Sequence, residues 1–153
     1  MKKIITVAVC AVMAFGLIGC SGTSKSDTNS SSAEASVSSP YSLKYGDLLD
    51  TTVTTKEDGY TIFVVKAGAD LASSNNLTIN QQYMNAVDLV QNQGADQYDE
   101  VQYWAVADLG NGDEKIVSFT LPSGVINEIV ENDLSAGLLP EYADDLYINQ
   151  KLK

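Results

Sequence analysis

The chain has 153 residues, a net charge of −11 from 9 basic and 20 acidic side chains, no histidine and 2 cysteines. All nine basic residues are lysines. These counts exclude histidine-dependent nucleophilic dyads, histidine-ligated zinc and bidentate guanidinium clamps. The acidic balance also argues against a nucleic-acid partner, because nucleic-acid binding needs a basic face.

The N-terminal residues have the pattern of an export signal. Two lysines follow Met1, and Ile4 to Gly19 are sixteen residues of which only Thr6 is polar. As a helix this run would span about 24 Å, which is less than the roughly 30 Å hydrocarbon core of a bilayer. The pattern therefore predicts a signal peptide over residues 1–19 rather than a spanning helix.

The end of this segment, Leu17-Ile18-Gly19-Cys20, resembles the lipobox of bacterial lipoproteins. The resemblance implies that Cys20 receives a diacylglycerol and becomes the first residue of the mature chain after cleavage. The diacylglycerol supplies two acyl chains, and two acyl chains are enough to hold a protein stably on a membrane. We therefore expect a lipid-anchored protein on the extracellular side of the cell membrane.

The rest of the chain divides into a linker and one domain. Nine of the nineteen residues from Ser21 to Ser39 are serine, a composition that predicts a disordered tether after the lipidated residue, over 20–39. Residues 40–153 have the length of a single domain. They carry 6 lysines against 18 carboxylates, a net of −12. Because Cys10 lies in the signal peptide and Cys20 is the anchor, the domain must depend on a packed core rather than a disulfide.

The first half of the domain predicts a hairpin followed by the main helix. Thr- and Val-rich residues 48–56 and the apolar run 60–67 favour two strands, and the turn sequence Glu57-Asp58-Gly59 joins them. A helix is then predicted from an N-cap at Thr78 to a stop at Gly94. Its apolar face consists of Ile79, Tyr83, Ala86, Val87 and Val90.

The second half repeats the pattern. Residues 101–109 and 115–121 predict strands around the hairpin signal Asn111-Gly112. A short helix with Ser123 as N-cap follows, then a loop or broken turn over 132–140, and residues 146–148 form a last strand or a packed tail. Four apolar side chains are expected on the buried side of the short helix: Val125, Ile126, Ile129 and Val130. The order β-β-α-β-β-α plus tail predicts an α+β two-layer sandwich, with a mostly antiparallel sheet covered by one main helix.

The sequences QYWAVADLGNGDEKIVSFTLP and EYADDLYINQKL resemble a domain that recurs in uncharacterised lipoproteins and secreted proteins of Gram-positive bacteria. The resemblance covers most of residues 48–153. It implies a Gram-positive surface location, and no known activity, cofactor or catalytic residue.

Carboxylates are the abundant reactive groups of the domain. Adjacent pairs occur at Asp99-Glu100, Asp113-Glu114 and Asp144-Asp145, but neighbours on a strand point to opposite faces, so none is a self-evident acid/base pair. Residues 108–114 faintly resemble a calcium loop, although a hairpin turn explains them more simply. We expect no metal, no cofactor and no catalytic residue.

The candidate partner-binding residues are aromatic: Tyr98, Tyr103 and Trp104. Tyr103 and Trp104 must point to opposite faces of a regular strand, so at most one of them faces the helix-covered core. If Trp104 is exposed, it becomes the natural centre of a protein or carbohydrate contact.

These observations favour a binding module over an enzyme. The expected partner is an envelope or secreted protein, with an immunity or inhibitor role belonging to the same class, and the acidic domain favours a basic partner. The alternatives are a carboxylate-dependent wall hydrolase and a structural accessory subunit of an envelope complex.

Overall fold

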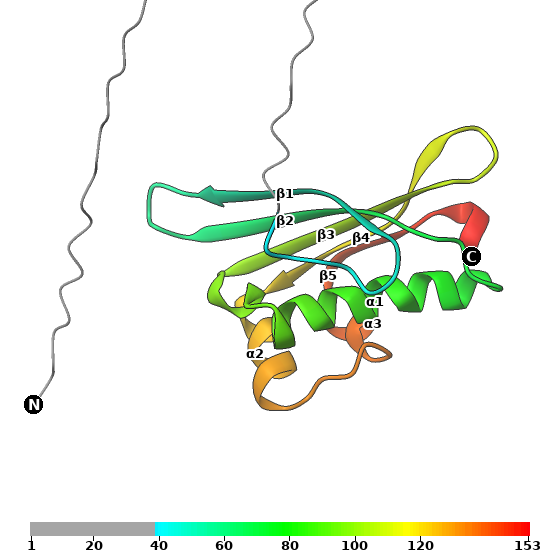
Figure 1. Ribbon diagram of the computed structural model, residues 1–153. Helices are drawn as coiled ribbons and strands as arrows, with labels where there is room; N and C mark the ends of the chain where they lie inside the picture. Colours follow the sequence, from blue (N-terminus) through cyan, green and yellow to red (C-terminus); the bar gives the residue numbers. More distant parts are fainter. Residues whose placement is uncertain (1–38) are drawn as a thin grey trace, which may run out of the picture. The chain divides into compact units, whose positions relative to one another are not determined.

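The computed structural model describes residues 39–153, which form one five-stranded sheet with its helices on one side (Figure 1). The predicted signal peptide, the lipidation of Cys20 and the tether up to residue 38 lie outside the described residues. The strands are β1 Asp47–Thr55, β2 Thr61–Gly68, β3 Glu100–Asp108, β4 Asp113–Pro122 and β5 Asp144–Ile148. The helices are α1 Asn75–Asn92, α2 Ser123–Glu131 and α3 Leu139–Tyr142, with short 3-10 turns at Ala95–Gln97 and Gln150–Leu152.

The spatial order of the strands is the same as their order in the chain, β1-β2-β3-β4-β5. β2 and β3 pair in parallel because α1 carries the chain back between them, and the other three pairings are antiparallel. The predicted α+β class with a mostly antiparallel sheet is therefore confirmed. The C-terminal residues form an edge strand, β5, rather than a tail packed over a face.

Apolar side chains alternate along β2, β3 and β4, so that one face of the sheet is buried beneath α1 and α2. Tyr103 lies near the centre of this core, with its ring 5.3 Å from that of Phe119, which in turn meets Tyr83 of α1 at 5.4 Å. The other large side chains exposed by less than 2% include Phe63, Leu89, Ile116, Leu121, Ile129 and Leu139.

The main helix begins one turn earlier than predicted. Ser74 is the N-cap, since its side chain accepts a hydrogen bond from the Leu77 backbone N–H at 3.3 Å. The prediction that Thr78 caps the helix is wrong: Thr78 is buried inside the first turn. The apolar pattern placed the helix start too late, because the residues of the actual first turn before Thr78 are polar or exposed. The predicted stop at Gly94 is confirmed, because this residue has φ 83° directly after the C-cap.

Two predictions for the short helix α2 are also wrong. Pro122 is the extended residue before the helix, and Ser123 is already helical with no side-chain cap. Val130 is 47% exposed rather than buried. It directly follows the fully buried Ile129, and each residue of a helix is rotated by about 100° from the one before it.

The predicted β3–β4 hairpin is confirmed, but its turn differs from a two-residue Asn-Gly turn. Positive φ angles occur at Gly110 (101°) and Gly112 (92°) and not at Asn111. The Asp108 carboxylate closes the longer loop, because its Oδ1 accepts hydrogen bonds from the N–H groups of Gly110 at 2.7 Å and Gly112 at 3.0 Å.

Candidate functional site

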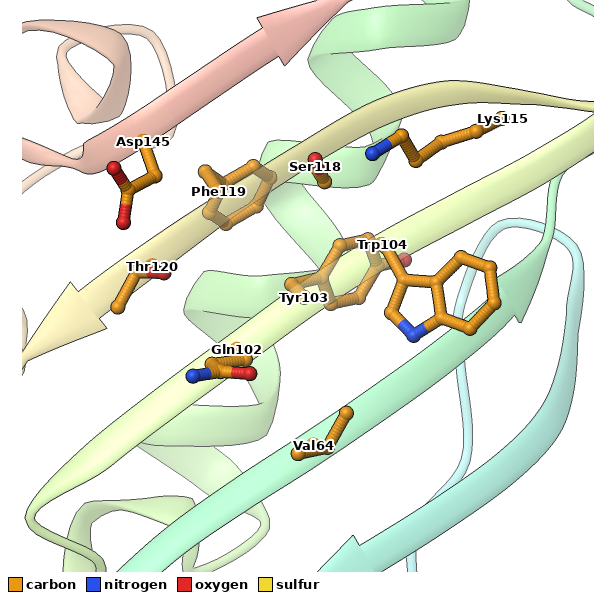
Figure 2. Close-up of a pocket in the computed structure, with 9 residues that line it drawn as sticks. All are labelled: Val64, Gln102, Tyr103, Trp104, Lys115, Ser118, Phe119, Thr120 and Asp145. Carbon is orange, nitrogen blue, oxygen red and sulfur yellow. The ribbon is translucent and has the colours of Figure 1, made fainter.

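The face of the sheet opposite the helices carries a hollow of about 520 Å³. Figure 2 shows this hollow with the strands in front of α1. Four strands contribute to its lining: Val64 from β2, Gln102 and Trp104 from β3, Lys115, Ser118 and Thr120 from β4, and Asp145 from β5.

The strand register gathers these side chains. Trp104 is paired with Lys66 on one side and with Ser118 on the other, and all three side chains therefore share the open face. Two residues away along the strands, Gln102 is paired with Val64 and Thr120 in the same way. The hollow thus combines one large aromatic ring with hydroxyl and amide groups that can donate and accept hydrogen bonds.

Charged groups flank the aromatic ring. The Lys66 ammonium lies 4.9 Å from the centroid of the Trp104 ring, and the Lys115 ammonium lies 4.6 Å from that of Tyr147. Asp145 lines the hollow from β5 in a left-handed conformation with φ 53°, at an irregularity in the β4–β5 pairing. Lys66 therefore lies beside the indole, while Lys115 and Asp145 offer a cation and a carboxylate elsewhere in the lining of the hollow.

The three predicted aromatic residues are not brought together. Trp104 is partly exposed in the hollow. Tyr103 is 1% exposed on the opposite face, where its hydroxyl donates to Gln82 Oε1 at 2.9 Å. Tyr98 stacks on Phe63 with ring centroids 4.8 Å apart, at one end of the core. Of the three, only Trp104 has its side chain on the open face.

Burial raises the pKa of two tyrosine phenols of the core face above its ordinary value. Desolvation and a hydrogen bond with Tyr98 raise the pKa of Tyr41 to about 12. Burial likewise raises the pKa of Tyr103. Neither phenol is ionised near neutral pH, so both act as neutral hydrogen-bonding groups that hold the fold.

The carboxylates of the predicted pairs serve different local roles. Asp99 accepts hydrogen bonds from the Thr61 backbone N–H at 2.7 Å and from its hydroxyl at 2.8 Å, and these bonds lower the pKa of the carboxyl. Its neighbour Glu100 accepts from the Tyr60 hydroxyl at 3.1 Å. Both groups therefore join the starts of β2 and β3.

Other acidic residues are dispersed. Among the residues that line the hollow in the described part of the chain, Asp145 is the one carboxylate, whereas glycoside hydrolysis uses two facing carboxyl groups. Within residues 39–153, no three Cys, Asp or Glu side chains gather closely enough to hold a metal ion. The side chains that line the hollow can stack through the Trp104 ring and can donate or accept hydrogen bonds through Gln102, Ser118 and Thr120.

Of the side chains on the open face, the sequence singled out Trp104 as a binding candidate; it indicated Asp145 only as half of an acidic pair, and it did not indicate Lys66 or Lys115. The two-residue period of the predicted strands could have indicated part of this site, because alternate residues of a strand lie on one face. Such pairs are 64 and 66, 102 and 104, and 118 and 120. What the pattern lacks is the pairing of strands distant in sequence, which places Lys66 beside Trp104.

No protein-family model, curated protein or solved structure matches the chain. In the part of the chain described here, 39–153, no helix is both long and apolar enough to cross a membrane.

Proposed function

We propose that this protein is a lipoprotein, anchored to the outer side of the cell membrane of a Gram-positive bacterium, that binds an envelope or secreted protein on its Trp104 face. The observation that carries the binding proposal is the hollow around Trp104 on the sheet face that the helices leave open. The lipobox Leu17-Ile18-Gly19-Cys20 supports the anchor.

The charges support a protein partner with a mixed surface. The net charge of −12 over residues 40–153 favours approach of a basic protein, mainly through the rate of association. On the open face, Lys66 beside the indole of Trp104 and Lys115 in the lining of the hollow offer partners for a carboxylate. An inhibitor or immunity protein that captures a secreted toxin would use such a surface.

The anchor is tested by replacing Cys20 with Ser. Without an acyl-accepting thiol, the chain should move from the membrane fraction to the medium or the soluble fraction. Cys10→Ser is the matched control and should leave the chain with the membranes. Fractionation followed by immunoblotting measures both, and membrane retention of Cys20→Ser equal to that of the wild type would contradict the anchor.

The binding face is tested by site-specific crosslinking in intact cells. A photo-reactive residue at Ser118, inside the hollow, should give a discrete adduct of higher mass with the partner. The same residue at Gln91, exposed on the helical layer, is the control and should give none. Adducts from Gln91 alone, or none from either position, would argue against the proposed face.

A further inference from the structure

The outer side of β1 is an unprotected sheet edge. Within residues 39–153 no strand pairs with it, and the side chains from Thr52 to Thr55 are exposed. β1 has nine residues; its two aspartates and the irregularity in its pairing lie between Asp47 and Asp50, whereas Thr51 to Thr55 pair regularly and contain no charged residue and no proline. The other edge strand, β5, is five residues long, carries Asp144 and has the left-handed Asp145. Only β1 therefore offers a long stretch of backbone for another strand.

The hydrogen bonds at the β1–β2 turn show which backbone groups face this edge. The Lys56 N–H donates to the Tyr60 carbonyl at 2.8 Å, so these two residues form a hydrogen-bonded pair. Such pairs alternate with non-bonded pairs in an antiparallel ladder. Consistently, the Thr61 carbonyl accepts from the Asp99 N–H at 3.1 Å, on the side away from β1. Its partner Thr55 therefore directs its own N–H and C=O outward.

The same alternation directs the backbone groups of Val53 and Thr51 toward the free edge. We propose that β1 pairs antiparallel with β1 of a second copy of this chain, about a two-fold axis at Val53. In this register each Val53 is hydrogen-bonded to its symmetry mate, and Thr51 lies opposite Thr55. Two sheets of five strands then become one continuous sheet.

The charges on β1 select this register. With Val53 on the axis, Asp50 lies opposite Lys56 of the second copy, and symmetry makes two such pairs. If the two-fold axis moved by one residue to Thr52, Asp47 would lie opposite Glu57 of the second copy. If it moved to Thr54, Asp50 would lie opposite Asp58. Cross-strand pairs of opposite charge stabilise a sheet and pairs of like charge destabilise it, so both neighbouring registers are disfavoured.

Pairing also buries an exposed apolar side chain. Val53 is paired with the core residue Phe63 and points to the same face, yet it is 49% exposed. Figure 1 shows the β1–β2 hairpin reaching past the helical layer. In an antiparallel pair related by a two-fold axis, the helix-covered faces of both copies lie on the same side of the joined sheet. The two Val53 side chains therefore meet on that side. The two Trp104 hollows then lie on one face of the joined sheet.

The pairing is tested by disulfide formation with the full chain in detergent solution. Cys10 and Cys20 are replaced by Ser, so that the introduced cysteine is the one thiol. Hydrogen-bonded antiparallel residues have Cα atoms about 5.5 Å apart, within the range that a disulfide spans. Val53→Cys should therefore give a covalent dimer on mild oxidation. Val130→Cys, at an equally exposed valine on α2 (47%), should stay monomeric.

A charge exchange tests the register independently. Lys56→Glu alone and Asp50→Lys alone should each raise the dimer dissociation constant about tenfold or more, measured by light scattering with size-exclusion chromatography. The double variant Asp50→Lys/Lys56→Glu restores opposite charges and should return it to within about threefold of the wild type. Thermal melting shows that each variant is folded, since Lys56 also lies over the Tyr60 ring.

Four outcomes would overturn the proposal. A wild-type chain that is monomeric at all concentrations would do so. So would equal crosslinking by the two cysteine variants, or a double variant as weak as the single ones. A monomer whose β1 edge is occupied by a strand of a different protein would also contradict pairing with a second copy.

Discussion

Replacing Asn85 with Ala should lower the free energy of unfolding by about 3 kcal/mol. Asn85 is fully buried on α1 and holds the segment that leads into β1. Its Oδ1 accepts from the N–H groups of Lys44 at 3.1 Å and Tyr45 at 3.0 Å, and its Nδ2 donates to the Tyr45 carbonyl at 2.8 Å. Alanine leaves three partly buried backbone groups without their side-chain partner, and because a fully buried unsatisfied group costs about 1–3 kcal/mol, about 1 kcal/mol for each is expected.

Urea unfolding measures this loss as a lower midpoint with an unchanged slope. Asn92→Ala is the matched control on the same helix, because Asn92 is exposed and its side chain bonds only to Asp88, at 2.7 Å. Its effect should stay within about 0.5 kcal/mol. Equal losses for the two variants would show that Asn85 does not hold residues 44–45 to the helix.

Replacing Trp104 with Ala should remove most of the partner binding while leaving the domain folded. A tryptophan at the centre of an interface commonly contributes 2 kcal/mol or more, which corresponds to about a 30-fold loss of affinity. Because Trp104 is partly exposed and lies outside the helix-covered core, its loss should cost little stability. Capture of the partner by the anchored chain on intact cells measures binding, and thermal melting measures stability.

Tyr142→Ala provides the control for this exchange. Tyr142 is an exposed aromatic residue on α3, 47% accessible and on the helical side of the sheet. We expect its variant to capture the partner as well as the wild type does. If Tyr142→Ala and Trp104→Ala reduced capture equally, the binding surface would not be the open face.

The fold class could be predicted because the hydrophobic pattern of each element is local. Residues 60–67 and 115–121 predicted strands and residues 78–94 a helix, and all three correspond to β2, β4 and α1 within a few residues. The parallel pairing of β2 with β3 could not be predicted, because it depends on how α1 packs across the sheet. The helix starts were missed where the first turn is polar, as at Ser74.

The candidate site, too, could be predicted only in part from the sequence. Adjacent positions in one strand require Tyr103 and Trp104 to face opposite sides, as observed. Which of the two sides the helices cover is decided by packing over the whole sheet, so Trp104 could be singled out only conditionally. Tyr98 was grouped with them because it is near in sequence, whereas its ring belongs to a cluster with Phe63 and Tyr41.

The most direct measurement of the proposed function uses the partner identified by crosslinking from Ser118. Its dissociation constant is determined for the wild-type lipidated chain and for Trp104→Ala, both in the same membrane vesicles. Binding on the Trp104 face predicts that the variant is weaker by about 30-fold or more. Dissociation constants that agree within about threefold would contradict the Trp104 face as the binding surface.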